Sequence, residues 1–260
     1  MNLHTIDLNG KAAIVTGAAN GIGRRTAIAC ADAGAAVAIF DIDTENGKKV
    51  EDEINTSGAK ALFIETDVSK EAQVKNAVAK TAEAFGRIDI LVNNAGITGP
   101  TYLEETSEED WDNILGVNLK GPFLCIKHCL AHMKKNRFGR IVNISSIAAI
   151  AGGGLVGRAH YAASKAGLVA LTKAAAKHYG QFGITANAIA PGPIRTRLSE
   201  SWVKVREKEV AATMPSQRIG ETEDIASAVL YLSSPQASFI TGQTFICDGG
   251  MTIATAKFIV

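Results

Sequence analysis

Short apolar runs alternate with longer segments of helical pattern along the whole chain. The apolar runs are continuous in Val, Ile, Leu and Ala, and they do not alternate with polar residues as half-exposed strands would. This pattern is typical of parallel strands that are covered on both faces. It predicts strands at residues 12–16, 36–40, 61–65, 88–92, 140–144, 185–190 and 244–246. It predicts helices near residues 21–33, 44–56, 71–85, 108–135, 161–181 and 221–232.

The alternation of strands and helices indicates the fold class. Strand–helix–strand units with right-handed crossovers build an α/β fold, here a doubly wound (Rossmann) sheet of seven parallel strands with helices on both faces. No Pro- or Ser-rich linker divides the chain, so we expect one domain over residues 1–260.

One segment, residues 194–214, breaks this alternation. It is charged, has a helical pattern and is not followed by a strand. In a doubly wound fold it would lie beyond the carboxyl end of a strand, where ligands bind. We interpret it as a lid over a substrate site, with a solvated surface insertion as the alternative.

The charge balance and the cysteines argue against several classes of protein. Lys and Arg total 27 and Asp and Glu total 26, which gives no reason to expect a nucleic-acid or membrane partner. Four cysteines without a CxxC motif argue against a disulfide framework or a zinc ribbon. The first residues lack a signal-peptide pattern, and the longest stretch without formal charge, residues 141–157, contains polar residues and three consecutive glycines. We therefore expect a cytoplasmic protein.

A glycine-rich turn joins the first strand to the first helix and reads TGAANGIG over residues 16–23. Gly17 would permit the tight turn, Gly21 would let the backbone approach a pyrophosphate, and Gly23 would let the helix pack against the strand. The start of the helix offers unpaired N–H groups and a partial positive charge to phosphates. The turn therefore predicts a dinucleotide site.

An acidic residue, Asp41, ends the second predicted strand. A carboxylate there can accept hydrogen bonds from the adenosine ribose hydroxyls, and it would repel a 2′-phosphate. Asn20 stands where a Lys or Arg could have bound that phosphate, so both residues favour NAD over NADP. The alternative for Asp41 is a cap on the next helix.

A tyrosine and a lysine, Tyr161 and Lys165, are four residues apart and share one face of a predicted helix. An ammonium near the phenol would lower its pKa and make Tyr161 a general acid/base near neutral pH. Ser145 and Ser146 follow the strand at residues 140–144, where a hydroxyl could hold a substrate oxygen.

Six motifs occur in a fixed order along the chain. They are TGAANGIG at residues 16–23, NNAG at 93–96, Asn118 in VNLKG, Ser146 after NIS, YAASK at 161–165 and PGPIRT at 191–196. With these motifs the sequence resembles the short-chain dehydrogenase/reductase family over residues 11–250. The resemblance implies an NAD-dependent oxidoreductase that interconverts a secondary alcohol and a ketone by hydride transfer, without a metal, as a homotetramer.

The resemblance also implies a role for each matched residue. Tyr161 would be the catalytic acid/base, Lys165 would bind the nicotinamide ribose and lower the pKa of Tyr161, Ser146 would orient the substrate oxygen, and Asn118 would hold a water of the proton relay. The implied cofactor contacts are Gly17, Asn20, Gly21, Ile22, Gly23, Asp41, Asp67, Val68, Asn94, Ala95, Gly96, Tyr161, Lys165, Pro191, Gly192, Ile194 and Thr196.

Two departures from the family pattern leave alternatives open. The spacing between Ser146 and Tyr161 is slightly long, so Ser145 stays an alternative catalytic serine. The extra residues fall in the loop 149–160, which faces the substrate in the family and here contains Gly152, Gly153 and Gly154. The apolar tail, residues 251–260, is expected either to cover a subunit interface or a neighbouring site, or to be a frayed end.

Other reactive side chains have two interpretations each. Arg195, Arg197 and Arg206 around the lid would either attract an anionic substrate or be solvated lid charges. Cys125, His128, Cys129 and His132 have the helical spacing of metal ligands, but the implied reaction needs no metal and we expect none.

Two rival functions share this scaffold. A 3-oxoacyl carrier-protein reductase would have the same fold and catalytic residues, but it normally uses NADPH, which Asp41 disfavours, and a basic docking patch. Phe182 stands where those reductases often have an Arg, while Arg137 is compatible with docking. A non-catalytic dinucleotide-binding regulator is the other rival, although such proteins usually lose the Tyr or the Lys.

Overall fold

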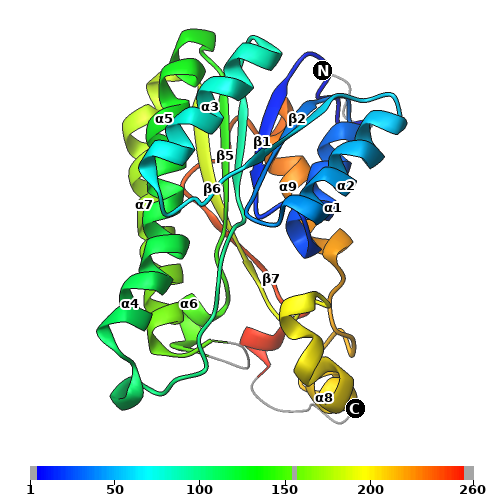
Figure 1. Cartoon of the computed structure of the whole chain (residues 1–260). Helices are drawn as coiled ribbons and strands as arrows, with labels where there is room; N and C mark the ends of the chain where they lie inside the picture. Colours follow the sequence, from blue (N-terminus) through cyan, green and yellow to red (C-terminus); the bar gives the residue numbers. More distant parts are fainter. Residues whose placement is uncertain (1–4, 154–156, 255–260) are drawn as a thin grey trace.

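The structure of the chain is a computed structural model that describes residues 5–153 and 157–254, apart from the side chains of Leu198, Ser201, Trp202 and Lys204. Gly154 and the tail residues 255–260 lie outside the described residues. Within the described ranges, seven parallel strands form one sheet in the order β3-β2-β1-β4-β5-β6-β7 (Figure 1). The strands are β1 Ala12–Thr16, β2 Ala36–Asp41, β3 Ala61–Glu65, β4 Ile90–Asn93, β5 Gly139–Ile144, β6 Ile184–Pro191 and β7 Thr244–Cys247. The predicted doubly wound sheet in one domain is confirmed.

Helices cover both faces of the sheet (Figure 1). One face carries α1 Gly21–Asp32, α2 Thr44–Thr56 and α9 Thr222–Ser233, and the other carries α3 Glu71–Phe85, α5 Gly121–Asn136 and α7 Ala159–Tyr179. Val15 of β1 shares one core with Cys30 of α1, whereas its neighbour Ile14 shares the opposite core with Val74 of α3. Because both faces are covered, the strands are mostly apolar, and polar strand residues such as Asn143 and Asn187 are buried.

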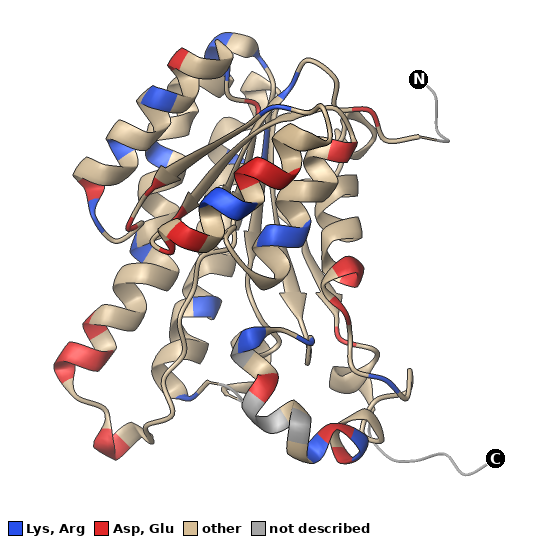
Figure 2. Cartoon of the chain, turned by 45° about the vertical axis from the view of Figure 1, so that its right-hand side comes forward, with Lys and Arg blue, Asp and Glu red and all other residues tan. Residues whose placement is uncertain are grey.

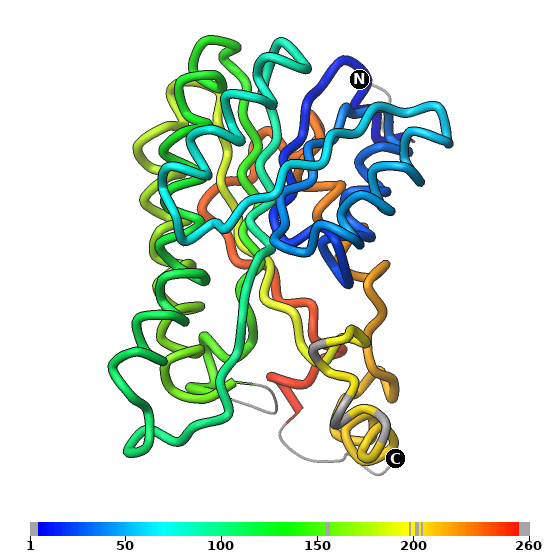
Figure 3. Tube along the Cα trace, in the orientation of Figure 1, coloured from blue at the N-terminus to red at the C-terminus, as the bar shows by residue number. Residues whose placement is uncertain are grey.

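The strand order changes direction between β1 and β4. In doubly wound sheets this switch leaves a crevice at the carboxyl ends of the strands, where ligands bind. In Figures 1 and 3 those ends point downward, toward α6 Ala148–Ala151 on one side and α8 Glu200–Ala211 on the other. Short helical turns also lie at Leu103–Glu105, Gly180–Phe182, Pro235–Ala237 and Met251–Ile253.

The helix predicted at residues 108–135 is confirmed, with a π-helical turn inside it that the sequence pattern does not predict. Between α4 Glu108–Leu115 and α5 lies a π-helical turn, Gly116–Lys120, which carries Asn118. The Asn118 side chain accepts from the backbone N–H of Ile97 and donates to its carbonyl, both at 2.9 Å. The wider turn directs this side chain to the loop after β4, a contact that hydrophobic spacing along the sequence does not encode.

The segment after β6 forms the predicted helical insertion. A short turn, Arg197–Ser199, leads into α8. The insertion has a small core of its own, made of Val203, Val210, Met214 and Ile219. A parallel bridge between Ile194 and Gly220 joins the two ends of the insertion. The insertion therefore packs around a core of its own, and its two ends lie side by side.

Charged side chains of both signs are interspersed over the helices (Figure 2). Acidic residues gather between Leu103 and Asp112, where the sequence has no Lys or Arg.

In the part of the chain that the structure describes, no helix is long and apolar enough to cross a membrane. One chain is described, so the homotetramer stays a prediction.

Substituting Gly23 with Ala is expected to destabilise the fold at the first strand–helix junction. An added Cβ would lie 2.0 Å from the carbonyl oxygen of Gly17, so the backbone of the turn must move, at a cost of about 2 kcal/mol. Gly180→Ala is the control, because a Cβ there meets nothing within 4 Å and its φ of −56° suits any residue. Thermal unfolding should show a lower midpoint for Gly23→Ala and an unchanged one for Gly180→Ala. Equal midpoints would contradict the close packing of the turn.

Candidate active site

One pocket at the carboxyl ends of the strands brings the predicted site residues together. It is bordered by the glycine turn, by the ends of β2, β4, β5 and β6, and by α7. The predicted residues that line it are Gly17, Asn20, Gly21, Ile22, Asp41, Asp67, Val68, Asn94, Ala95, Gly96, Ser146, Tyr161, Lys165, Pro191, Gly192, Ile194 and Thr196. Two predicted residues lie behind the wall: Gly23 packs against Gly17, and Asn118 is buried next to Lys165.

Several other residues that line the pocket had no predicted role. They are Phe40, Ile42, Thr66, Ile97, Val117, Ile144, Pro193 and Ser199. Ile42 directly follows Asp41 and Pro193 lies inside the PGPIRT motif, so their sequence neighbours could have indicated them. Thr66 and Val117 carry no such signal, because only the folding of separate elements brings them to the pocket.

The glycine turn is held in a conformation that suits a phosphate. Gly17 and Gly21 have φ of 64° and 56°, and a Cβ at Gly17 would lie 2.8 Å from Cα of Ala95. The Nδ2 of Asn94 donates to the carbonyls of Thr16 and Gly17, both at 3.0 Å. Asn20 directs its amide to Asp43, 3.2 Å away, and does not cap α1. The first N–H groups of α1 therefore have no side-chain cap at the edge of the pocket.

Two carboxylates lie at the β2 end of the pocket. Asp41 accepts hydrogen bonds from the backbone N–H of Ala19 at 2.9 Å and of Asp43 at 3.0 Å. The cap of α2 is Asp43, which accepts from the backbone N–H of Asn46 at 3.1 Å. Hydrogen bonds from Asn46 are the largest cause that lowers the pKa of Asp43. The alternative role for Asp41, a helix cap, is therefore wrong, and Asp41 faces the pocket.

The side chains of Asn118 and Lys165 both lie close to Gly96. A Cβ at Gly96 would lie 3.3 Å from both Oδ1 of Asn118 and Nζ of Lys165. The amide of Asn118 also donates to Oγ of Ser164 at 3.1 Å, and that hydroxyl donates to the carbonyl of Tyr161 at 2.7 Å. These contacts fix Asn118 against the helix that carries Tyr161 and Lys165.

The two serines after β5 have different surroundings. Ser145 is buried and donates to the carbonyl of Lys165 at 2.9 Å. Ser146 forms a side-chain hydrogen bond with Tyr161, and its Oγ accepts from the N–H of Ala148 at 3.1 Å. The geometry therefore favours Ser146 as the serine that acts together with Tyr161.

Burial shifts the pKa values of Tyr161 and Lys165 in opposite directions. Burial lowers the pKa of Lys165 to about 8, and its ammonium donates to the carbonyl of Ile144 at 2.8 Å. Burial raises the pKa of Tyr161, and the hydrogen bond with Ser146 opposes this only in part. The expected lowering of the Tyr161 pKa is therefore wrong for this structure, in which the Lys165 ammonium lies 5.7 Å from the centre of the phenol ring.

The Cys and His residues of α5 have separate environments. Cys125 and Cys129 are buried in the core shared with α3, and burial raises the pKa of Cys125 to about 12. The Nε2 of His128 lies 3.2 Å from a carboxylate oxygen of Glu71. Among the described residues, no group of three or more His, Cys, Asp or Glu side chains is placed to hold a metal ion.

Comparison with protein families explains why these residues occur together. A family sequence model described as "Enoyl-(Acyl carrier protein) reductase" matches residues 17–252, which include most of the glycine turn, Ser146, Tyr161, Lys165 and the segment 194–214. The chain belongs to the short-chain dehydrogenase/reductase family. Members of this family are oxidoreductases that bind a nicotinamide dinucleotide.

Relatives of this short-chain dehydrogenase/reductase match it over nearly its whole length. The (2S)-[(R)-hydroxy(phenyl)methyl]succinyl-CoA dehydrogenase subunit BbsD of Thauera aromatica is 41% identical over 249 residues, 95% of this chain and 98% of the relative. The 3-oxoacyl-[acyl-carrier-protein] reductase FabG of Thermotoga maritima is 40% identical over 246 residues, 95% and 99% of the two chains. The crystal structure of gox2181 has a TM-score of 0.89 at 33% identity and covers 95% of this chain and 97% of its own.

Replacing each serine with Ala should separate their roles. Ser146→Ala removes the hydroxyl next to Tyr161 and should lower kcat/KM about a hundredfold, with little change in thermal unfolding. Ser145→Ala removes the hydrogen bond to the Lys165 carbonyl, and should cost about 1 kcal/mol of stability with a smaller loss of activity. Steady-state kinetics and thermal unfolding of both variants provide the measurement. A larger loss of activity in Ser145→Ala would reverse the assignment.

Ketone reduction should slow as the pH rises above about 8. The pKa of Lys165 is lowered to about 8, so its ammonium is lost in this range, whereas Tyr161, with a raised pKa, keeps its proton. If the Lys165 charge supports cofactor binding and the proton path, kcat/KM should be flat below this pH and fall above it. The profile from about pH 6 to 10 measures this. A rate that stays constant to the alkaline end would contradict a role for the Lys165 charge.

Proposed function

We propose that this protein is an NAD(H)-dependent oxidoreductase that interconverts a secondary alcohol and a ketone. The observation that carries the proposal is the composition of one pocket. Asp41 lies at one end, the glycine turn lies between, and Tyr161, Lys165 and Ser146 lie at the other end. This order of groups fits an extended dinucleotide, with ribose hydroxyls at the carboxylate, phosphates at the start of α1 and the nicotinamide next to Tyr161.

The chain supplies orientation and a proton path. When bound, the nicotinamide would supply the hydride for ketone reduction or accept it in alcohol oxidation. The Ser146 hydroxyl hydrogen-bonds to the substrate oxygen and orients it. The Tyr161 hydroxyl gives its proton to that oxygen in reduction and takes it back in oxidation. Lys165 and Asn118, whose side chains both lie close to Gly96, would form the start of the path by which Tyr161 exchanges that proton with solvent.

The choice of NAD rests on the charges at the β2 end of the pocket. Asp41 faces the pocket, and Asp43 lies next to Asn20 at the same end. A 2′-phosphate placed there would meet two carboxylates, and like charges at short distance cost several kcal/mol. Of the two cations among the described pocket residues, Lys165 belongs to the catalytic end, and Arg197 interacts with Asp43, one of these two carboxylates. These charges support NAD over NADP.

The test is turnover of NAD and NADP with a panel of secondary alcohols that includes 3-hydroxyacyl thioesters. We expect kcat/KM to be at least about a hundredfold higher with NAD, from the repulsion of the 2′-phosphate. Asp41→Asn keeps an acceptor for the Ala19 N–H but removes the charge, so it should reduce the preference by about tenfold or more. Asp32→Asn, on the exposed end of α1, is the control and should change nothing. A wild-type preference for NADP would contradict the proposal.

A second candidate is a 3-oxoacyl carrier-protein reductase, which the FabG relative favours. BbsD, too, is named for an acyl thioester, a succinyl-CoA derivative. Turnover restricted to NADPH and 3-oxoacyl thioesters would establish this candidate. Tyr161→Phe separates both from a non-catalytic regulator, because an enzyme of either kind should lose at least about a hundredfold in turnover without its acid/base.

A further inference from the structure

The three arginines around the predicted lid, residues 194–214, differ in their surroundings. Arg195 forms ion pairs with Glu207 at 2.7 Å and with Glu221 at 3.0 Å. Arg206 pairs with Glu209, three residues further along α8, at 2.6 Å. The Arg197 side chain forms no hydrogen bond or ion pair within residues 5–153 and 157–254, and it lines the pocket. The alternative of solvated lid charges therefore fits Arg206, whereas Arg197 is a cation that faces the site.

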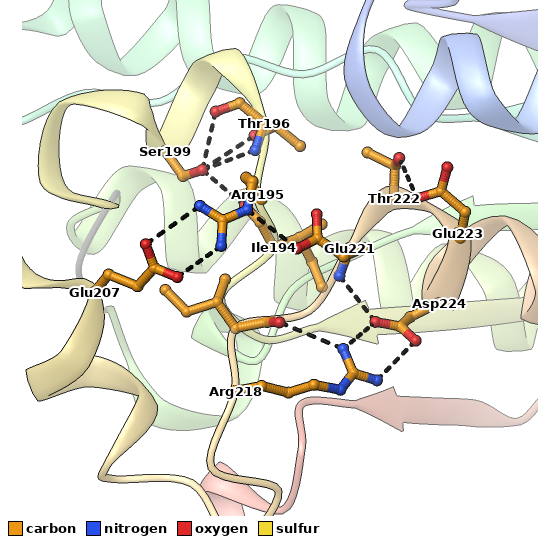
Figure 4. A network of polar contacts seen from close by, with 11 residues as sticks. Ile194, Arg195, Thr196, Ser199, Glu207, Arg218, Glu221, Thr222, Glu223 and Asp224 are labelled. Carbon is orange, nitrogen blue, oxygen red and sulfur yellow. Dashed lines mark hydrogen bonds and ion pairs between the residues drawn. The ribbon is translucent and has the colours of Figure 1, made fainter. Parts of the chain in front are cut away.

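The backbone on both sides of Arg197 is held in place (Figure 4). The N–H of Arg195 donates to the carbonyl of Gly220 at 2.8 Å, and the Arg195 side chain connects Glu207 of α8 with Glu221 at the start of α9. After Arg197, the Ser199 hydroxyl accepts from the N–H of Thr196 at 2.9 Å. Because residues 194–199 are already ordered, binding an anion with Arg197 would order little more than its own side chain.

This ordered segment lies over the start of α1. A Cβ on Gly21, the first residue of α1, would lie 3.4 Å from Cγ2 of Thr196. Thr196 directly precedes Arg197, so the Arg197 side chain extends from the residue next to the one whose side chain faces Gly21. The Arg197 charge also contributes to the lowered pKa of Asp43, after the larger effect of the Asn46 hydrogen bonds, and Asp43 accepts from the Asn20 side chain.

The start of α1 gives the phosphates backbone N–H groups but no full charge. Lys165, the other cation of the described pocket, donates to the carbonyl of Ile144 at the catalytic end. We propose that Arg197 binds the diphosphate of the dinucleotide from the lid side, opposite the N-terminus of α1. This inference rests on the proposed function for the presence of a dinucleotide. A guanidinium suits the role, because its planar set of N–H donors can bind two phosphate oxygens at once.

Two phosphate groups could meet this arginine, and the structure favours the diphosphate. The 2′-phosphate that distinguishes NADP would lie at the β2 end, beside Asp41, whereas Arg197 follows Thr196, whose side chain faces Gly21 at the start of α1. The diphosphate is present in both NAD and NADP. Arg197 should therefore strengthen the binding of both cofactors by the same factor.

The test is binding, measured with the full chain by titration of NADH, NADPH and ADP-ribose into wild type, Arg197→Ala, Arg197→Lys and Arg206→Ala. Arg197→Ala should weaken all three ligands about tenfold, since each carries the diphosphate and one charged hydrogen-bond partner is lost. Arg197→Lys should recover part of the loss. Arg206→Ala is the matched control and should bind as wild type does. The affinity of Arg197→Ala should also depend less on salt, because a screened charge contact is gone.

The outcomes separate this inference from the proposed function. Equal affinities in wild type and Arg197→Ala, or a salt dependence unchanged by the substitution, would overturn the role of Arg197. A loss confined to NADPH would assign Arg197 to the 2′-phosphate and overturn the diphosphate assignment. If wild type binds none of the three ligands, the proposed function fails as well. If wild type prefers NADPH but Arg197→Ala weakens all ligands equally, the inference stands and only the choice of NAD is overturned. Thermal unfolding of each variant confirms that the comparison is between folded proteins.

Discussion

The close contact between the glycine turn and the end of β4 holds the two halves of the site together. Oγ1 of Thr16 accepts from the backbone N–H groups of Asn94 and Ala95, both at 3.0 Å, while the Asn94 amide donates back to the turn. The loop after β4 then continues to Ile97, which is bonded to Asn118. One series of short contacts therefore sets the distance between the nucleotide half and the catalytic half. It exists because the strand order reverses between β1 and β4.

Burial determines the electrostatics of the catalytic half. Tyr161, Lys165 and Asn118 are almost fully removed from water, and each is tied to a backbone carbonyl or to a neighbouring side chain. In such surroundings the neutral forms of Tyr161 and Lys165 are favoured, so the pKa of Tyr161 rises while that of Lys165 falls to about 8, and the two pKa values move apart. Lys165 is then the group whose protonation changes closest to neutral pH. A bound anion near it would favour its charged form again.

The ion pairs of the segment after β6, the predicted lid, hold its elements in place but add little to the stability of the fold. Its ion pairs, such as Arg195 with Glu207 and Arg218 with Asp224, are exposed, and exposed pairs contribute little to the free energy of unfolding. Their geometry nevertheless connects α8, the base of the insertion and the start of α9 (Figure 4). The lid segment that reaches the pocket is thereby placed before any ligand binds, and Arg197 is the charge that this arrangement leaves facing the pocket.

The sequence by itself determined the elements and the members of the site. Continuous apolar runs predict the strands because both faces of a parallel sheet are buried, and Gly17, Tyr161 and Lys165 were found from local spacing and motif order. Only the tertiary structure decided which of two neighbouring residues takes a given role in the site. Ser145 and Ser146 are alike in sequence, but one bonds to a carbonyl of α7 and the other to Tyr161. The π-helical turn at Asn118, the direction of the Tyr161 pKa shift and the different surroundings of Arg195 and Arg197 have the same origin. Each depends on burial and on contacts between residues far apart in the chain, which local spacing does not record.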